Sequence, residues 1–274
     1  MSDADVMTGA EATAAAFVDA RREARSLNDY PGKAPTTLDA AYRIQDAAIA
    51  LRGGTIAGWK VGRIQPPLDA QFGTTRLAGP IFADLVHLAL PVREAPVFAG
   101  GFGAIEAEFL FRLGDVPAGR TDWSVPDALD CVTAVHIGFE IASSPFIGIN
   151  RLGPTVTASD FGNNNGLLIG PAIADWQSGG IDSMTVTTRI NDVVVGTGQA
   201  ASFPGGCGGS IAFLLENLAR RGIAIAPGTW VSTGAVTGVH EIAPGSIAVA
   251  DFGGSDNVSN RIECHIVAAV PGTD

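Results

Sequence analysis

Residues 104–111 read AIEAEFLF and place two glutamates, Glu106 and Glu108, in an otherwise apolar run. Successive side chains of a β-strand point to opposite faces, so both glutamates lie on one face and apolar residues cover the other. Their Cα atoms are then roughly 6–7 Å apart. Two like charges at that distance in an apolar strand are unfavourable unless a positive group lies between them. The alternative is a strand face that is open to solvent.

A second candidate strand, residues 132–142 (VTAVHIGFEIA), also carries one isolated acid. Alternation places Glu140 on the same face as His136, while bulky apolar side chains fill the opposite face. Three carboxylates from two strands, without thiolates, suit a hard cation such as Mg²⁺ or Mn²⁺. His136 could be a fourth ligand, although a single histidine in an apolar strand is more often a core residue. The pattern favours a metal site over a solvated face.

The sequence around these two segments is typical of a β-rich domain, because Gly and Pro punctuate short β-branched runs. Glycine supplies 35 of the 274 residues, well above the average share of about 7%. One helix is expected from Ser210 to Arg221, and Ser210 is a better N-cap than nucleophile because the GxSxG motif is incomplete. Further strands are expected within residues 55–63, 167–173, 184–198, 229–236 and 246–252.

The N-terminal part of the chain predicts helices instead. Residues 9–52 are rich in Ala, Leu, Glu and Arg and contain one short Pro/Gly break. Thr37 is a candidate N-cap for the second helix, and Gly53 ends it. No linker or low-complexity run follows. We therefore expect a small helical region, residues 1–54, packed on a β-rich catalytic domain, residues 55–274.

Composition excludes several classes of function. Seventeen basic residues against 28 acidic ones give a net charge of −11, and no basic stripe indicates nucleic-acid binding. No segment is apolar enough to span a membrane, and the acidic N-terminus is unlike a secretory signal. No Gly-rich segment completes a nucleotide-binding motif. Three widely spaced cysteines indicate a reducing compartment and argue against disulfides or a thiolate zinc site. We expect a cytoplasmic protein that binds neither nucleic acid nor membranes.

Two further residues have unusual surroundings. The chain has only two lysines, and Lys60 lies in AGWKVG beside Trp59 and Val61. A lysine there either extends from a strand edge into water or lies buried beside an anionic ligand. Asp84, in GPIFADL, follows an apolar run. On its own it is interpreted as a loop residue.

Taken in order, these segments resemble the fumarylacetoacetate hydrolase superfamily, in its 2-keto-4-pentenoate hydratase and 4-oxalocrotonate decarboxylase branch. The resemblance runs from AYRIQDAAI through GWKVG, GPIFAD, IEAEFLF and GFEIASS to GTGQAA and APGSIAVADFG. It implies an α+β fold, a mixed and strongly twisted β-roll with flanking helices, which commonly forms homo-oligomers. By position it also implies that Glu106, Glu108 and Glu140 bind the metal, that Lys60 lies beside the substrate, and that Asp84 transfers a proton.

The sequence departs from the family pattern near the substrate. Residues 63–67, RIQPP, stand where the family often has a Thr-Ser or Thr-His pair, and residues 143–144 are Ser-Ser instead of Asp-Ser. Asn163, Asn164 and Asn165 lie in FGNNNG, residues 161–166, where the family has a stretch like Asp-Asn-Ala-Ser-Ser-Gly, so amides replace its serine hydroxyls. They are candidates for binding the distal end of the substrate or the attacking water, although such a run also suits a turn.

The activity predicted from this resemblance is metal-dependent hydration of a 2-hydroxy-2,4-dienoate, or its 2-keto tautomer, to a 4-hydroxy-2-ketoacid. The cation would stabilise negative charge on the C2 oxygen. Lys60 would neutralise the substrate carboxylate or pass protons, and Asp84 would shuttle a proton. Three alternatives remain open. They are decarboxylation of a 2-oxo-3-enedioate, a non-catalytic metal-binding partner subunit, and hydrolysis of an acylpyruvate C–C bond.

Overall fold

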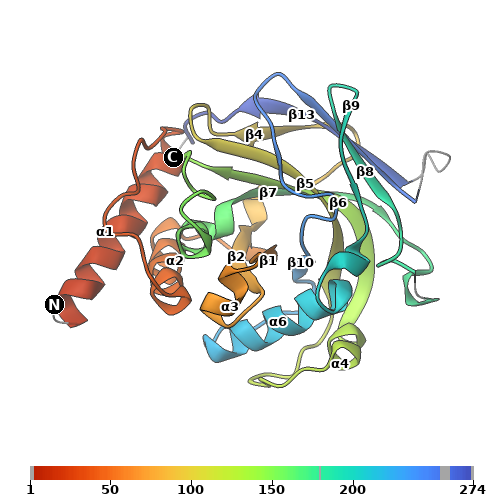
Figure 1. Cartoon of the computed structure of the whole chain (residues 1–274), viewed down its shortest axis with the longest axis horizontal. Helices are drawn as coiled ribbons and strands as arrows, with labels where there is room; N and C mark the ends of the chain where they lie inside the picture. The colour runs from red at the N-terminus through yellow and green to blue at the C-terminus, as the bar shows by residue number, and fades with distance from the viewer. Residues whose placement is uncertain (1–2, 179, 254–259, 273–274) are drawn as a thin grey trace.

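Two mixed β-sheets make up most of the structure, a computed structural model that describes residues 3–178, 180–253 and 260–272 (Figure 1). The α+β class is confirmed. Within the described residues, the larger sheet has eight strands, and β11 pairs with β5 beside the main path. In spatial order its strands are β2 (Arg76–Phe82), β1 (Ile56–Arg63), β10 (Trp230–Ser232), β5 (Phe102–Leu113), β6 (Val132–Ser144), β7 (Asn164–Ala172) and β3 (Val86–Leu88), with β11 at His240–Glu241. The smaller sheet has the order β4 (Arg93–Val97), β13 (Arg261–Ala268), β12 (Ile247–Phe252), β8 (Val186–Ile190) and β9 (Val193–Gly198).

Helices flank the larger sheet. Figure 1 shows α1 and α2 at one side of the molecule and α6 beneath the sheet. The α-helices are α1 (Asp3–Arg22), α2 (Leu38–Arg52), α3 (Leu68–Phe72), α4 (Val125–Asp130), α5 (Pro154–Ser159) and α6 (Gly206–Arg220). Short 3₁₀ turns are η1 (Ala83–Leu85), η2 (Phe161–Asn163), η3 (Trp176–Ser178) and η4 (Ala200–Ser202). None of the helices in the described ranges combines the length and hydropathy that a transmembrane helix needs.

The core lies between the two sheets. Phe109 on β5 packs edge-to-face against Phe252 on β12, with ring centroids 5.3 Å apart. Both side chains are fully buried. The apolar face of β5, predicted from alternation, is therefore directed into this core, and the opposite face carries the glutamates.

The predicted second helix forms as expected and is fastened to the sheet. The Thr37 hydroxyl accepts a hydrogen bond from the Ala40 N–H, and Gly53 ends the helix with φ of 65°. On its buried face, the Tyr42 hydroxyl accepts from the Ala78 N–H and Gln45 Nε2 donates to the Ala78 carbonyl. These bonds hold α2 against β2. The division at residue 54 stays a prediction.

The start of α6 differs from the expected one. The helix begins at Gly206, so Ser210 lies inside it and is not the N-cap. Gly205 and Gly206 have φ of 71° and 63°, and the Asp182 carboxylate accepts the Cys207 N–H. The prediction based on the local serine is wrong because a distant aspartate satisfies the first turn.

Candidate metal centre and substrate cavity

The structure brings the three predicted carboxylates together on one face of the larger sheet. Glu106 on β5 lies directly opposite Glu140 on β6, and Glu108 lies opposite Gly138. One oxygen from each carboxylate lies within 4.8 Å of the other two. Glu106 is 4% exposed, and Glu108 and Glu140 are fully buried.

Hydrogen bonds orient two of these carboxylates. Glu108 Oε2 accepts from the Ser232 hydroxyl and, at 2.8 Å, from the Gly234 N–H. Glu140 Oε1 accepts from Asn164 Nδ2 at 3.0 Å. Glu108 Oε1 is buried and has no hydrogen-bond partner among the described residues. A buried carboxylate oxygen without a donor is costly in a protein interior, and a cation ligand position accounts for it.

Lys60 lies beside the carboxylates. Its Nζ is 3.3 Å from Glu140 Oε2 and donates a hydrogen bond to Asn163 Oδ1 at 3.2 Å. Burial acts to lower the pKa of Lys60, but the three nearby carboxylates outweigh burial and raise the pKa. Lys60 is therefore a buried ammonium and not a strand-edge lysine reaching into water.

The charge balance of the cluster favours a divalent cation. Burial, the largest cause, raises the pKa of both Glu108 and Glu140 above that of an ordinary glutamate. Three ionised carboxylates and one ammonium leave an excess of two negative charges in a buried site. Such an excess is unfavourable unless it is neutralised. The all-oxygen donor set suits Mg²⁺ or Mn²⁺, so the residues fit the cation that the sequence predicts.

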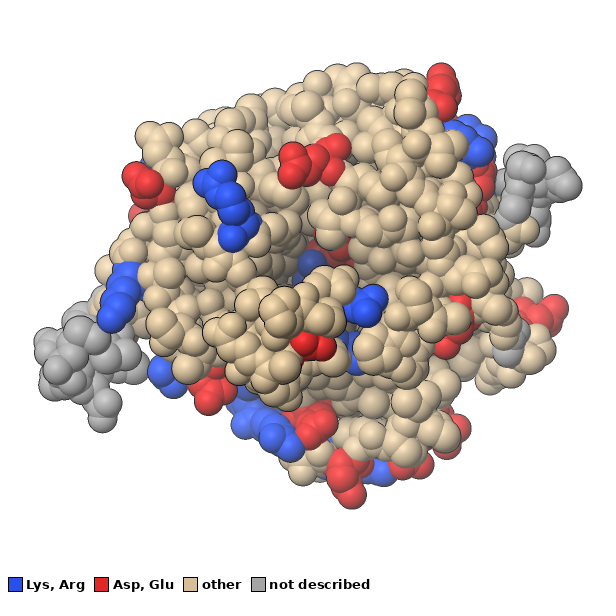
Figure 2. All heavy atoms as spheres, viewed as in Figure 1, with Lys and Arg blue, Asp and Glu red and all other residues tan. Residues whose placement is uncertain are grey.

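A cavity of about 800 Å³ opens onto this cluster, and Lys60, Glu106 and Asn163 line it. Figure 2 shows the molecule hollowed on one face, with acidic and basic atoms visible inside the hollow. The cavity gives a small anionic molecule access to the carboxylates.

The three asparagines have different positions. Asn163 lines the cavity and has φ of 59°, while Asn164 bonds Glu140 and Asn165 Nδ2 donates to the Pro96 carbonyl. The turn η2, which leads into these asparagines, packs closely against β2. A Cβ atom on Gly79 of β2 would lie only 2.1 Å from the Phe161 carbonyl oxygen. Only Asn163 of the three is among the cavity-lining residues. The left-handed backbone at Asn163 also agrees with the turn alternative.

Asp84 does not lie with the other predicted site residues. Its side chain is 64% exposed, it accepts a hydrogen bond from Arg52 at 2.7 Å, and it is not among the residues that line the cavity. Strand β2 ends at Phe82, and the turn η1 directs Asp84 toward the end of α2, where Arg52 lies 3.6 Å from the centroid of the Phe82 ring. The structure therefore does not place Asp84 at the cavity, and its part in proton transfer stays a prediction.

We expect Asp84→Asn to change turnover by less than about twofold, because an exposed ion pair contributes only about 0–1 kcal/mol. Steady-state kinetics of the purified variant, with the melting temperature as a folding control, measure this. A loss of turnover by orders of magnitude would restore Asp84 to the reaction.

His136 has the structural role that was the alternative to ligation. Its Nδ1 lies 2.8 Å from the Gly170 carbonyl oxygen, and its ring packs edge-on against Trp230. The carboxylate cluster contains no histidine among the described residues.

Two arginines on the cavity wall were not predicted as site residues. Arg63 and Arg76 are direct neighbours across β1 and β2, and both line the cavity. Arg76 is 7% exposed, and its Nε donates to Ser210. Burial and the charge of Arg63 lower the pKa of Arg76. Within the described residues, neither guanidinium has a carboxylate within ion-pair distance. The sequence does contain one indication of this pair, because the basic residue Arg63 directly follows GWKVG.

Comparison with known proteins agrees with this architecture. No protein-family model matches the sequence. A curated 4-oxalocrotonate decarboxylase from Pseudomonas putida is 25% identical over 256 residues, which span 85% of this chain and 88% of that protein. The structure of 4-oxalocrotonate decarboxylase from Pseudomonas putida G7, complexed with magnesium and adipate, matches with a TM-score of 0.78 and 22% identity, covering 97% of this chain and 99% of that one.

A more distant match shares the fold. Fumarylpyruvate hydrolase from Pseudomonas aeruginosa, in complex with Mn²⁺ and pyruvate, has a TM-score of 0.54 and 15% identity over 77% of this chain and 89% of that one. The fold is common to these proteins over the matched residues, and the sequence similarity to the decarboxylase extends over most of both chains. The chain therefore shares its fold with these structures and is similar in sequence, over most of its length, to a 4-oxalocrotonate decarboxylase.

Proposed function

We propose that the protein is a divalent-metal-dependent decarboxylase of a 2-oxo-3-enedioate such as 2-oxo-3-hexenedioate. The observation that carries this proposal is the cavity, which combines the carboxylate cluster and Lys60 with two arginines, Arg63 and Arg76, that have no carboxylate partner among the described residues. Strand rise places Arg63 about 10 Å along β1 from Lys60 at Cα, a separation that long side chains can shorten. A dicarboxylic substrate has an anionic group for each end of this arrangement.

The same observation favours decarboxylation over the hydration expected from sequence. A 2-hydroxy-2,4-dienoate has one carboxylate, which leaves Arg63 and Arg76 without an anionic partner. The 25% identical relative is a decarboxylase, which supports the same choice. The related decarboxylase structure is complexed with adipate, a six-carbon dicarboxylate, and this is consistent with a dicarboxylic substrate here.

Glu106, Glu108 and Glu140 would hold the cation. When bound, a divalent cation supplies a Lewis acid that stabilises the negative charge developing on the substrate's 2-oxygen. The Ser232 hydroxyl and Gly234 N–H keep Glu108 oriented, and Asn164 keeps Glu140 oriented. This support holds the ligands in place before substrate arrives.

The reaction breaks the bond between C5 and the C6 carboxylate. Its electron pair moves through the conjugated system to the 2-oxygen, CO₂ leaves, and one proton is taken up to give 2-hydroxypenta-2,4-dienoate. Lys60 Nζ, held by Asn163 and Glu140, is placed to donate a hydrogen bond to an anionic oxygen of the substrate. Arg63 and Arg76 would bind the distal carboxylate and align the breaking bond with the π-system.

Arg63→Met is expected to raise the KM for the dicarboxylate about tenfold or more, because a hydrogen bond to a charged group contributes about 1.5–3 kcal/mol. The attraction weakens as the carboxylate becomes neutral CO₂, so kcat should change less than KM. Steady-state kinetics measure both constants. Arg220→Met is the matched control, because Arg220 lies on the surface of α6 and pairs with Glu216. An unchanged KM in Arg63→Met would remove the arginines from substrate binding.

The proposed function itself is tested by a substrate comparison. The protein with Mg²⁺ is incubated separately with 2-oxo-3-hexenedioate and with 2-hydroxypenta-2,4-dienoate, and the products are identified by NMR. We expect the dienol product from the first substrate and no consumption of the second. Conversion of the second to a 4-hydroxy-2-ketoacid would establish the hydratase instead. Metal binding without turnover of either would indicate a non-catalytic subunit.

A further inference from the structure

We propose that Arg21, on the N-terminal helix α1, is a positioning residue for the metal centre. Its guanidinium fixes the end of β6 and the start of β7, just beyond Glu140, and thereby sets the orientation of that ligand. The inference rests on the proposed metal centre. It gives the N-terminal helical region a part in metal binding in addition to packing.

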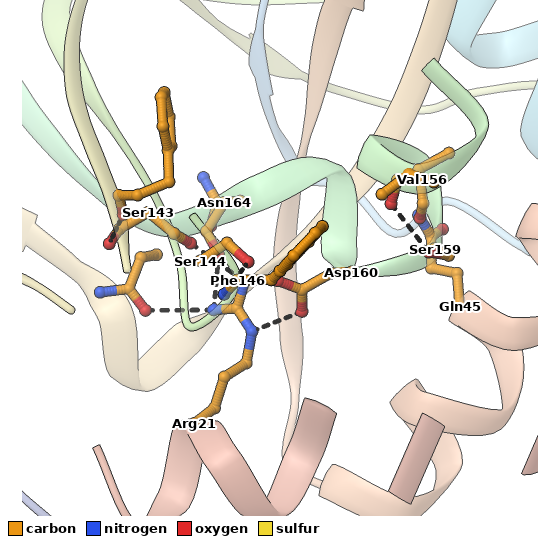
Figure 3. Close-up of polar contacts among 12 residues, drawn as sticks. Arg21, Gln45, Ser143, Ser144, Phe146, Val156, Ser159, Asp160 and Asn164 are labelled. Atoms are coloured by element: carbon orange, nitrogen blue, oxygen red, sulfur yellow. Dashed lines mark hydrogen bonds and ion pairs between the residues drawn. The ribbon is translucent and has the colours of Figure 1, made fainter. Parts of the chain in front are cut away.

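Each of the three guanidinium nitrogens of Arg21 donates a hydrogen bond to at least one acceptor. Nε and Nη2 form a bidentate ion pair with Asp160, at 2.7 and 2.9 Å. Nη2 also donates to the Ser143 carbonyl at 3.1 Å. Nη1 donates to the Asn164 carbonyl at 3.1 Å and to Asn165 Oδ1 at 3.2 Å. Figure 3 shows Arg21 extending from its helix into this group of acceptors. The Arg21 side chain is 10% exposed, and that of Asp160 is 1% exposed.

These acceptors lie where the sheet is irregular. The pairing of β6 with β7 shifts register between Glu140 and Ala142, so the regular ladder is interrupted just beyond the ligand. The carbonyls of Ser143 and Asn164 lie at this interruption, where a backbone acceptor needs another donor. Arg21 supplies that donor to both strands. A single guanidinium thus joins the two strands at the interruption.

The segment of residues 160–165, which Arg21 contacts, also bonds residues of the metal centre through two side chains. Asn164 Nδ2 donates to Glu140 Oε1, and Asn163 Oδ1 accepts from Lys60 Nζ. Asp160 is joined to them by the turn η2, whose Phe161 ring lies 5.1 Å from the Arg21 guanidinium carbon. Movement of this segment would therefore move the partners of both Glu140 and Lys60. Arg21 itself touches neither, so it acts through the asparagines.

The next residue on α1, Arg22, provides a control for substitutions of Arg21. Arg22 pairs with Asp19, and its side chain is 55% exposed. Arg22→Met therefore removes a similar charge from the same helix end without disturbing the buried network. The two substitutions separate a general effect of charge on α1 from the specific contacts of Arg21.

We expect Arg21→Met to weaken Mn²⁺ binding by about 10–100-fold, as loss of residues that support metal ligands typically does. Titration of the full-length protein with Mn²⁺, followed by electron paramagnetic resonance, measures this without substrate. Arg22→Met should bind Mn²⁺ as the wild type does. Arg21→Lys keeps a charge near Asp160 but cannot span the carbonyls of both Ser143 and Asn164. It should therefore fold, but its affinity for Mn²⁺ should be lower than that of the wild type.

A double variant distinguishes positioning from stability. Arg21→Met with Asp160→Asn removes the buried unpaired carboxylate and should recover much of the melting temperature lost in Arg21→Met. Mn²⁺ affinity should remain low, because the two carbonyls still lack their donor. Wild-type Mn²⁺ affinity in folded Arg21→Lys, or recovery of affinity together with stability in the double variant, would overturn the proposal. Absence of Mn²⁺ binding in the wild type would instead overturn the metal centre itself.

Discussion

Replacing Glu108 with glutamine is expected to abolish metal-dependent turnover while the fold is retained. The amide oxygen of glutamine can still accept the hydrogen bonds from Ser232 and Gly234 that Glu108 Oε2 accepts. The variant loses the negative charge and the unpartnered Oε1 that suit a cation. We expect turnover to fall by about 10³-fold or more, which corresponds to about 4 kcal/mol of activation free energy.

Thermal unfolding separates the metal effect from damage to the fold. In the metal-free state, Glu108→Gln should be at least as stable as the wild type, because it removes one of three crowded carboxylates. Added Mg²⁺ should raise the melting temperature of the wild type much more than that of the variant. Glu216→Gln, on the surface of α6, is the matched control. Unchanged turnover in Glu108→Gln would exclude Glu108 from the site.

Lys60→Met is expected to lower kcat by roughly 10²–10³-fold, the usual effect of removing a preorganised donor to developing negative charge. Methionine approximates the buried length of the lysine side chain, so the change removes the ammonium and its bond to Asn163 more than it removes packing. Mn²⁺ should still bind, because the three carboxylates remain. Kinetics and Mn²⁺ titration of the same preparation measure the two effects separately.

The other lysine offers a direct control for this substitution. Lys33 lies exposed in the connection between α1 and α2. Lys33→Met should leave kcat unchanged. A change of only about twofold in Lys60→Met would make Lys60 a structural residue, with its ammonium serving to balance Glu140.

Local sequence patterns were sufficient to identify the three carboxylates as candidate metal ligands. Alternation along an apolar strand requires Glu106 and Glu108 to share a face, and it isolates Glu140 in the same way on the next long strand. The antiparallel register that places Glu140 opposite Glu106 needed the structure or the family resemblance. The strands were recognisable because one face of each is almost wholly apolar.

Other features depend on partners that are distant in sequence. Asp84 follows an apolar strand, but the direction of its side chain is set by the turn η1 and by Arg52 on α2. The Arg63–Arg76 pair becomes visible only when β1 and β2 are paired. In the sequence, Arg21 looks like any other basic residue at the end of a helix. Its importance is hidden because its partner Asp160 lies 139 residues further along the chain. No periodicity or local motif indicates a contact of that kind.

Carbon dioxide release from 2-oxo-3-hexenedioate, measured with Mg²⁺ and again after removal of divalent ions by EDTA, tests metal-dependent decarboxylation most directly. We expect one CO₂ for each 2-hydroxypenta-2,4-dienoate formed, loss of both products in EDTA, and recovery when Mg²⁺ or Mn²⁺ is restored. Two results would contradict the proposed function. One is CO₂ release that persists unchanged in EDTA, and the other is no CO₂ from protein that demonstrably binds Mn²⁺.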